Sequence, residues 1–311
     1  MINARSFISG IAFRTGDRRP LSALTTEIRR ADSSIESLHG NGLSCFCENG
    51  ESLARVCMQA ARETLTLTST STQQIRTVIL AGSNSDAIVS DNDETDFFIA
   101  LNELGINHAH VVGLSMLSCS AHADALTLAS TLVNLHGDSA LVIVFGERKK
   151  MSRVVPQGNI VFSDGAVSCI VDTRPAGFEI CANDSLTDTA LGMLDRGGSL
   201  RHLGDGVRAM HLLTTRLYET SGVKPEDLRA FFGINAGITQ LRIMAQAAGV
   251  PLELAYDADI GRYAHLHSCD ALIALRNYAQ NHELRNGDAF LLMAWSPHIV
   301  AGSVLRYAGH A

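Results

Sequence analysis

Cys119 is the residue of this sequence best placed to act as a nucleophile. It lies between Ser118 and Ser120, with Ala121 and Ala123 following, so small side chains would let a substrate approach its sulfur closely. The helical pattern that begins at Ser120 places the thiol at the N-terminal end of a helix, where the helix dipole and free N–H groups stabilise a thiolate. The pattern favours a nucleophile. The alternative is a plain core cysteine, which is a common fate of a free thiol.

A self-similar segment in the second half of the chain supplies a candidate partner for this thiol. The run from Ser118 to Leu126 and the run from Ala264 to Leu272 each end in Asp-Ala-Leu, and each leads to a Gly-Asp pair before an apolar strand. The second copy is four residues longer between these anchors, about one helical turn. Five residues before the aligned aspartates lie Cys119 and His265. If the halves pack about a pseudo-two-fold axis, these side chains can face each other, and His265 could act as general acid, general base or donor to a carbonyl oxygen.

Asn235 is the third candidate for the site. It lies in a strand-to-turn segment between Gly233 and Gly237, two glycines that permit sharp turns beside it. Its amide could equally serve only to satisfy that turn. By helical geometry His122 and His267 point elsewhere, and we interpret them as packing or rim residues.

Composition excludes several classes of function. With 46% hydrophobic and 18% charged residues the chain is expected to be folded, and its formal net charge of -7 argues against a protein that holds nucleic acid phosphates. The apolar runs are far shorter than the roughly 18 residues of a membrane-spanning helix. Residues 1–20 lack the order of a signal peptide. We therefore expect a soluble, cytoplasmic protein with no nucleic acid or membrane partner.

The other cysteines and the basic residues give weaker signals. Seven cysteines, most of them in apolar surroundings, are typical of reduced thiols, and disulfides are not expected. The pair Cys45-x-Cys47 has no second pair at zinc-ligand spacing, so a turn is favoured and no metal is expected. The basic cluster could meet the phosphates of a ligand or the acidic face of a partner protein, or could be a solvated loop. Its members are Arg148, Lys149, Lys150 and Arg153.

The elements that must position these residues alternate between strands and helices, as in βαβ units, and form two series. The first series predicts strands at 77–82, 110–113, 139–145, 166–172 and 177–182 and a helix at 120–135. The second predicts helices at 207–220, 239–248 and 268–280 and strands at 228–234, 289–295 and 300–306. An α/β layered fold of two similar halves results. We expect one half at residues 1–183, with Cys119, and the other at 184–311, with Asn235 and His265.

The order of these motifs resembles the ketoacyl-ACP synthase III family throughout the chain. The motifs are Cys119 among small residues, the turn Phe-Ser-Asp-Gly-Ala at 162–166, the Asn235 segment, the segment 262–270 and the Asn-Gly-Asp turn at 286–288. The resemblance implies a thiolase-like αβαβα fold, a homodimer, and an acyl-cysteine formed from acyl-CoA or acyl-ACP as substrate, with no separate cofactor. The N-terminal stretch is shorter than in that family.

Two departures from the family stand out. Its triad is Cys-His-Asn, but its histidine position is Ile234 here, followed by Asn235, and its asparagine position is His265. The pair Ala264-His265 resembles the Gly-His pair of relatives that transfer acyl groups to hydroxyl groups or unusual acceptors. The family also uses a backbone N–H of a C-terminal glycine-rich turn in its oxyanion hole.

The second departure concerns that oxyanion donor. The corresponding run, 295–298, puts Pro297 in its place, and proline has no N–H. Loss of one such donor costs on the order of 3 kcal/mol in the transition state, so catalysis would be weak or would depend on His265 or His298.

The hypothesis that unites these observations is a ping-pong acyltransferase or condensing enzyme of fatty acid or specialised metabolite biosynthesis. Cys119 takes the acyl group, and His265 with Asn235 manages the proton and the carbonyl charge of the acceptor. Acyl transfer to a non-standard acceptor is slightly favoured over ordinary chain initiation. The alternative is a non-catalytic thiolase-fold partner subunit of an active paralogue, a reading that Ile234 and Pro297 favour.

Overall fold

The computed structural model describes residues 5–82, 91–148, 152–155, 160–188, 200–296 and 298–309 of the chain. Lys149 and Lys150 of the basic cluster, and Pro297 of the expected oxyanion turn, lie outside these residues. None of the helices in the described part of the chain is both long and apolar enough to cross a membrane.

One large mixed sheet runs through the described residues. Its strand order is β5-β4-β6-β7-β1-β8-β11-β10-β9. The strands are β1 (Phe7–Thr15), β4 (Ile75–Gly82), β5 (His110–Leu114), β6 (Ser139–Gly146), β7 (Gly165–Asp172), β8 (Gly177–Thr187), β9 (Leu228–Phe232), β10 (Ala289–Trp295) and β11 (Ile299–Gly309). β4 pairs in parallel with β5 and β6, and β10 pairs in parallel with β9; the remaining pairs are antiparallel. A separate two-stranded sheet joins β2 (Asp17–Pro20) to β3 (Cys45–Glu48).

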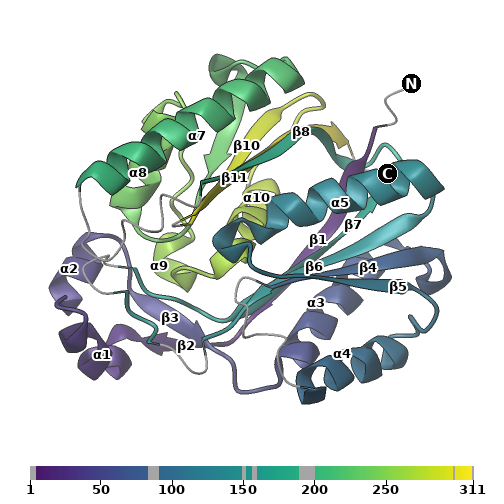
Figure 1. Ribbon diagram of the computed structural model, residues 1–311, viewed down its shortest axis with the longest axis horizontal. Helices are drawn as coiled ribbons and strands as arrows, with labels where there is room; N and C mark the ends of the chain where they lie inside the picture. Colours follow the sequence, from purple (N-terminus) through teal and green to yellow (C-terminus); the bar gives the residue numbers. More distant parts are fainter. Residues whose placement is uncertain are drawn as a thin grey trace.

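Helices cover this sheet in three layers (Figure 1). The helices of the described residues are α1 (Thr25–Arg30), α2 (Ile35–Gly40), α3 (Leu53–Thr68), α4 (Asp91–Glu103), α5 (Ala121–His136), α7 (Leu200–Ser221), α8 (Ile238–Ala247), α9 (Ile260–Tyr263) and α10 (Asp270–Asn281). Of these, α1 and α2 lie beside the small sheet of β2 and β3 and do not cover the large one. α3 and α4 pack on the outer face of the first half of the sheet, and α7 and α8 lie on the outer side of the second half. α5 and α10 share the central layer, where they contact strands of both halves.

The strands explain this layering because both of their faces are apolar. Along β6, Val142 and Val144 join the central core, while Leu141 and Ile143 join the core under α3 and α4. Strands buried on both faces read as continuous apolar runs, which is the pattern of residues 139–145. The predicted αβαβα order of layers is confirmed.

The two series of elements are equivalent in topology. The helix-strand-strand run α5, β6, β7 of the first half corresponds to α10, β10, β11 of the second, and β1 meets β8 at the middle of the sheet. The boundary expected at 183/184 falls within β8, which pairs with β1 of the first half and with β11 of the second. The division into residues 1–183 and 184–311 stays a prediction.

Candidate active site

Cys119 and His265 meet at the centre of the molecule. Cys119 lies in a short 3-10 turn that leads into α5, and His265 lies five residues before Asp270, the first residue of α10. Cys119 Sγ is 3.1 Å from His265 Nε2, and both side chains are buried. The structure thus brings together the two residues that the repeat placed at equivalent positions.

The backbone around this pair follows the same equivalence. His122 and Ser268 each lie two residues before the aligned aspartates, and the His122 N–H donates to Ser268 Oγ at 2.7 Å. Ser118 and Ala264, each six residues before them, have φ values of 49° and 54°. These are left-handed values that residues with a Cβ seldom adopt. Both halves therefore have a residue of positive φ directly before the side chain that they present to the site.

Asp270 is the residue that fixes the orientation of His265. Its Oδ2 lies 2.5 Å from His265 Nδ1 and also accepts the N–H of Asn235 at 2.7 Å. Its Oδ1 accepts the N–H of Leu266 at 2.8 Å. Asp270 is 1% exposed, so these contacts take the place of water. Cys119, His265 and Asp270 form a line of hydrogen-bonding groups in which the carboxylate selects the tautomer and direction of the imidazole.

The electrostatics of this line favour a proton on His265. Burial acts to lower the pKa of this imidazole, but the facing charges of Cys119 and Asp270, together with their hydrogen bonds, raise it to about 10. An imidazolium that contacts a sulfur at hydrogen-bond distance stabilises a thiolate. The arrangement can therefore supply both a nucleophile and a proton.

Asn235 is joined to this line through Asp270. Its main-chain N–H donates to Asp270 Oδ2, and its Nδ2 lies 3.3 Å from Asp270 Oδ1. The preceding residue, Ile234, is buried in the core beneath α7 and α8. The structure thus gathers all three predicted site residues, with Asn235 behind Asp270.

The turn at 162–166 holds the main chain of His265. Ser163 N–H donates to the carbonyl of His265 at 2.8 Å, and His265 N–H donates to the carbonyl of Val161 at 3.0 Å. The Phe162 ring packs on the imidazole with centroids 5.0 Å apart. The motif is therefore part of the mounting of the histidine.

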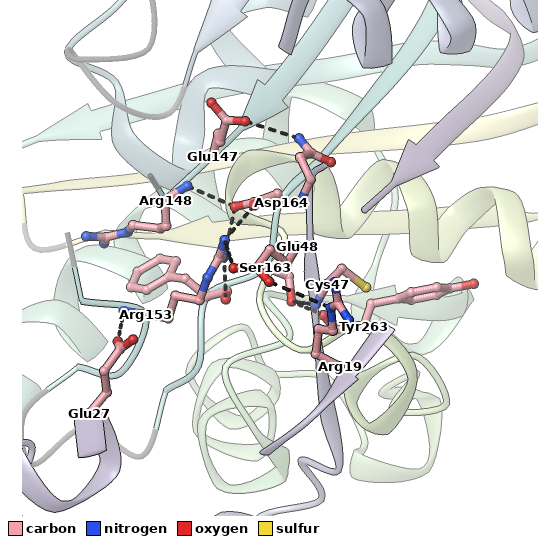
Figure 2. A network of polar contacts seen from close by, with 12 residues as sticks. Arg19, Glu27, Cys47, Glu48, Glu147, Arg148, Arg153, Ser163, Asp164 and Tyr263 are labelled. Atoms are coloured by element: carbon pink, nitrogen blue, oxygen red, sulfur yellow. Dashed lines mark hydrogen bonds and ion pairs between the residues drawn. The ribbon is translucent and has the colours of Figure 1, made fainter. Parts of the chain in front are cut away.

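A buried ion pair anchors that turn in its place (Figure 2). Both oxygens of Asp164 accept hydrogen bonds from the Arg153 guanidinium, at 2.9 and 2.6 Å, and Asp164 Oδ1 also accepts the Arg148 N–H at 2.8 Å. Ser163 Oγ accepts the Cys47 N–H at 2.9 Å and donates to the carbonyl of Tyr263. Of the predicted basic cluster, Arg153 thus has a structural role.

His122 and His267 are both buried, so they pack inside the protein and do not form a rim. Burial lowers the pKa of His122 to about 4. The His267 ring stacks on Phe162, with centroids 4.6 Å apart, and lies 5.7 Å from the His265 ring. His267 is therefore a near neighbour of the site, which helical geometry had not indicated.

The remaining cysteines have surroundings unlike those of Cys119. Burial raises the pKa of Cys169 to about 12 and that of Cys47 to about 11. Burial also raises the pKa of Cys57 and Cys269 well above the usual range. Among the described cysteines, Cys119 is the one that faces an imidazole.

Sequence reasoning missed the part of Asp270 in the site, although it used this residue to align the two copies. The signal was present, since an aspartate in the first turn of a helix can reach back to the preceding turn. The expected loss of an oxyanion donor at Pro297 falls outside the described residues. His298, named with it, is exposed.

Comparisons with known proteins agree with this fold. The family described as 3-oxoacyl-[acyl-carrier-protein] synthase III C terminal matches residues 218–307. The beta-ketoacyl-[acyl-carrier-protein] synthase III of Aquifex aeolicus (strain VF5) is 23% identical over 269 residues, which cover 83% of this chain and 85% of that protein.

Solved structures extend the likeness to the whole chain. The structure named ChlB3, an acyltransferase, has a TM-score of 0.86 at 15% identity and covers 99% of both chains. The Aquifex aeolicus 3-oxoacyl-[acyl-carrier-protein] synthase III has a TM-score of 0.79 at 20% identity, covering 97% of this chain and 100% of its own. Cerulenin-bound OleA of Xanthomonas campestris has a TM-score of 0.81 at 13% identity, covering 99% and 100%. The chain is a divergent, ketoacyl-ACP synthase III-like protein of the thiolase fold.

Proposed function

We propose that this protein is an acyltransferase that carries an acyl group on Cys119 as a thioester. The donor is acyl-CoA or acyl-ACP, and the product belongs to fatty acid or specialised metabolite biosynthesis. The observation that carries the proposal is the buried line from Cys119 through His265 to Asp270, with contacts of 3.1 and 2.5 Å. Acyl transfer from such a donor requires no metal or separate cofactor, because the donor thioester is already activated.

In the first half-reaction the Cys119 thiolate attacks the carbonyl carbon of the donor thioester. The tetrahedral intermediate collapses as the bond to the donor sulfur breaks, and the departing thiolate takes the proton from His265 Nε2. This step leaves acyl-Cys119, a free donor thiol and a neutral imidazole. Asp270 keeps Nδ1 protonated throughout, so that Nε2 is the nitrogen that exchanges protons.

In the second half-reaction the neutral imidazole accepts a proton from the acceptor. An acceptor O–H, N–H or S–H group attacks the acyl carbon as His265 Nε2 takes its proton, and Cys119 departs as thiolate. The starting imidazolium and thiolate are restored. A pair of histidine and carboxylate is suited to this kind of deprotonation.

The same geometry favours a heteroatom acceptor over carbon–carbon condensation. A condensation that proceeds by decarboxylation develops charge on an enolate oxygen, which needs hydrogen-bond donors more than a base. The position of the family's histidine is Ile234, an apolar residue buried in the core. We therefore place acyl transfer to oxygen, nitrogen or sulfur ahead of condensation.

Intact-mass spectrometry tests the proposal. The protein is incubated with a panel of acyl-CoA and acyl-ACP thioesters, beside Cys119→Ala and, as a matched control, the partly buried Cys181→Ala. We expect an increase of one acyl mass that persists in Cys181→Ala and disappears in Cys119→Ala. Absence of an adduct with every donor, in a protein of intact fold, would contradict the acyl-enzyme.

The rival function, a non-catalytic partner subunit, is not favoured. A subunit without chemistry has no need of a buried thiol held at 3.1 Å from an imidazole that is itself fixed by a carboxylate. A purified protein that is inactive alone and becomes active with a second, homologous protein would support this rival function.

We also propose a cytoplasmic homodimer. β5 forms an edge of the sheet, and its side chains range from exposed to half-buried. Edge strands leave N–H and C=O groups that a second copy can pair with. Light scattering of the purified protein tests this: twice the chain mass supports the homodimer, whereas a monomer that dimerises only with a paralogue supports a heterodimer.

A further inference from the structure

The ring of Phe162 lies between a guanidinium and two imidazoles. The Cζ atom of Arg148 is 3.8 Å from the centroid of this ring, on one face. The His265 and His267 rings lie against the opposite face, with centroids 5.0 and 4.6 Å from that of Phe162. Phe162 is 8% exposed, so the contacts on both faces are largely shielded from bulk water. The ring thus packs directly against the imidazole that contacts Cys119.

The main chain fixes the ring in this place. Phe162 and His265 form a parallel β-bridge, and two main-chain hydrogen bonds of 3.0 and 2.8 Å hold the two segments together there. The buried pair of Asp164 and Arg153 anchors the turn that carries Phe162 (Figure 2). Asp164 also accepts the main-chain N–H of Arg148 at 2.8 Å. The ring and the imidazole therefore cannot separate unless hydrogen bonds of the backbone break.

The proton on His265 needs support because burial opposes it. His265 is 2% exposed, and burial is the largest single influence on its pKa, which it acts to lower. The titratable groups that face this imidazole are Cys119 from the turn before α5, Asp270 from α10 and His267 from the turn before α10. Burial and the charge of His265 hold the pKa of His267 well below its usual range, so His267 is neutral. Cys119 and Asp270 meet the two nitrogens of His265, and neither covers a face of its ring.

Phe162 covers one face of that imidazole. The face of an aromatic ring carries partial negative charge and attracts a cation that lies within about 6 Å of its centroid. His265 lies at 5.0 Å, and the attraction is stronger where water is excluded. We propose that Phe162 is a positioning residue whose π face stabilises the protonated form of His265, and with it the thiolate of Cys119. The inference rests on the proposed acyl transfer, in which this proton passes to the departing thiolate of the donor.

The other role open to Phe162 is to fill space beside His265. A ring that acts by shape alone depends on its volume and not on the charge of its face. Fluorination withdraws electron density from the face of an aromatic ring and changes the shape of the ring little. A fluorinated phenylalanine at this position therefore separates the two roles.

Three variants of Phe162 test the inference in the full-length protein. Phe162→Leu removes the ring, Phe162→Tyr keeps it, and Phe162→trifluorophenylalanine, introduced at an amber codon, weakens the charge of its face. The matched control is Phe97→Leu, because Phe97 is 2% exposed and packs on Phe145 in the core under α3 and α4. The pKa of His265 is measured by NMR titration of isotope-labelled histidine, with His265→Gln to assign the signal. The initial rate at which iodoacetamide alkylates Cys119, followed by peptide mass, reports the thiolate.

We expect the pKa of His265 to fall by about one pH unit in Phe162→Leu, because a desolvated cation–π contact is worth about a factor of ten in an equilibrium constant. The trifluorinated ring should give about half of this fall, and Phe162→Tyr and Phe97→Leu should give none. Alkylation of Cys119 near neutral pH should slow in the same order, by up to about tenfold, because less imidazolium leaves less thiolate.

Three outcomes would overturn the inference. A pKa of His265 that falls in Phe162→Leu and stays unchanged with the fluorinated ring would assign the effect to shape. An unchanged pKa in both variants would show that the ring does not stabilise the proton. If Phe162→Leu forms acyl-Cys119 at the native rate from acyl-CoA donors, the ring has no part in the reaction.

Failure of the proposed function would look different. In that case the native protein forms no adduct with any acyl-CoA or acyl-ACP donor, while the pKa of His265 still responds to the variants of Phe162 as expected.

Discussion

The starts of α5 and α10 occupy equivalent places in the repeat, and each has a residue of positive φ six positions before the aligned aspartate, but their side chains do different things. In the first half the segment presents Cys119, and its aligned aspartate, Asp124, is half-buried and accepts a hydrogen bond from Ser185 Oγ at 3.1 Å. In the second half the segment presents His265, and Asp270 is buried and accepts hydrogen bonds from four N–H donors. The repeat thus supplies a geometry in which equivalent positions meet. Because the side chains at those positions differ, the first half supplies a nucleophile and the second half supplies an oriented base.

Substitution of the two aspartates should give the largest contrast. Asp270→Asn replaces one carboxylate oxygen by an NH2 group, which then faces a main-chain N–H or the N–H of His265 Nδ1. Two donors cannot hydrogen-bond to each other, so the imidazole loses its orientation. We expect the rate of acyl-Cys119 formation to fall about 1,000-fold, equivalent to about 4 kcal/mol. The matched change Asp124→Asn should alter the rate less than about threefold, because its hydrogen bond to Ser185 does not lead to Cys119.

A second readout distinguishes positioning from general damage. NMR titration of the imidazole should show the pKa of His265 falling from about 10 in Asp270→Asn and remaining unchanged in Asp124→Asn. If both variants slow the reaction equally at unchanged melting temperature, the contrast between the two halves is wrong.

His122 in the first segment and His265 in the second are both buried, and we expect them to respond to pH in opposite ways. His265 is stabilised with a proton, whereas burial lowers the pKa of His122 to about 4, from 6.5 in the unfolded chain. The unfolded state therefore binds the proton first, and the stability that neutral His122 contributes above pH 6.5 is lost as the pH falls through 4. The full effect is about 3 kcal/mol.

Urea denaturation between pH 7.5 and 4 isolates this contribution if His122→Met, an apolar residue that suits a helix, is compared with the native protein. The free energy of unfolding should fall less with acid in the variant, by about 3 kcal/mol over the window. Parallel curves would show that His122 does not titrate as a buried neutral group. Any change in stability that His267 causes in acid is the same in the native protein and in His122→Met, so it cancels in the comparison.

Much of the architecture could be predicted because the repeat is visible in the sequence. The helix at 120–135 and the strand at 289–295 were found at α5 (Ala121–His136) and β10 (Ala289–Trp295), and the register of the copies placed Cys119 opposite His265. Local periodicity and one aligned segment were sufficient for this.

The rest depends on contacts between residues far apart in the chain. β1 lies near the middle of the sheet, yet its run is broken by Gly10, and no periodicity marked it as a strand. The approach of Arg148 and His267 to the Phe162 ring depends on how β6, the 162–166 turn and α10 pack. A sequence pattern gives the faces of each element, but it does not give the distance between elements.

The residues three before the aligned aspartates give a further contrast. In the first half this residue is Ala121, a small core residue, and in the second it is His267, for which Gly146 makes room. A Cβ added at Gly146 would lie 2.4 Å from His267 Cδ2. Gly146→Ala should therefore cost about 2 kcal/mol of stability, measured by urea denaturation.

A double-mutant cycle tests the cause of that cost. Most of it should disappear when Gly146→Ala is made in a His267→Ala background, because the clash then has no partner. If the two changes destabilise the protein additively, the cost of Gly146→Ala does not come from a clash with His267.

The smallest effect concerns the residue of positive φ that precedes the site side chain in both segments. Ala264 precedes His265 with φ 54° and ψ −154°, a region that is almost confined to glycine and costs about 1 to 3 kcal/mol in other residues. Ala264→Gly removes this strain but loses a buried methyl group and gains freedom in the unfolded chain, together about 1.5 kcal/mol. For strain of about 2 kcal/mol, the middle of that range, we expect a net gain in stability of about 0.5 kcal/mol, seen as a higher melting temperature, with acylation of Cys119 retained. The same change at Ala274, buried within α10, should instead destabilise by about 1 to 2 kcal/mol. Equal losses at the two positions would show that the turn before His265 holds no strain, and that its left-handed geometry is a consequence of the packing of Phe162 and Asp270 around it.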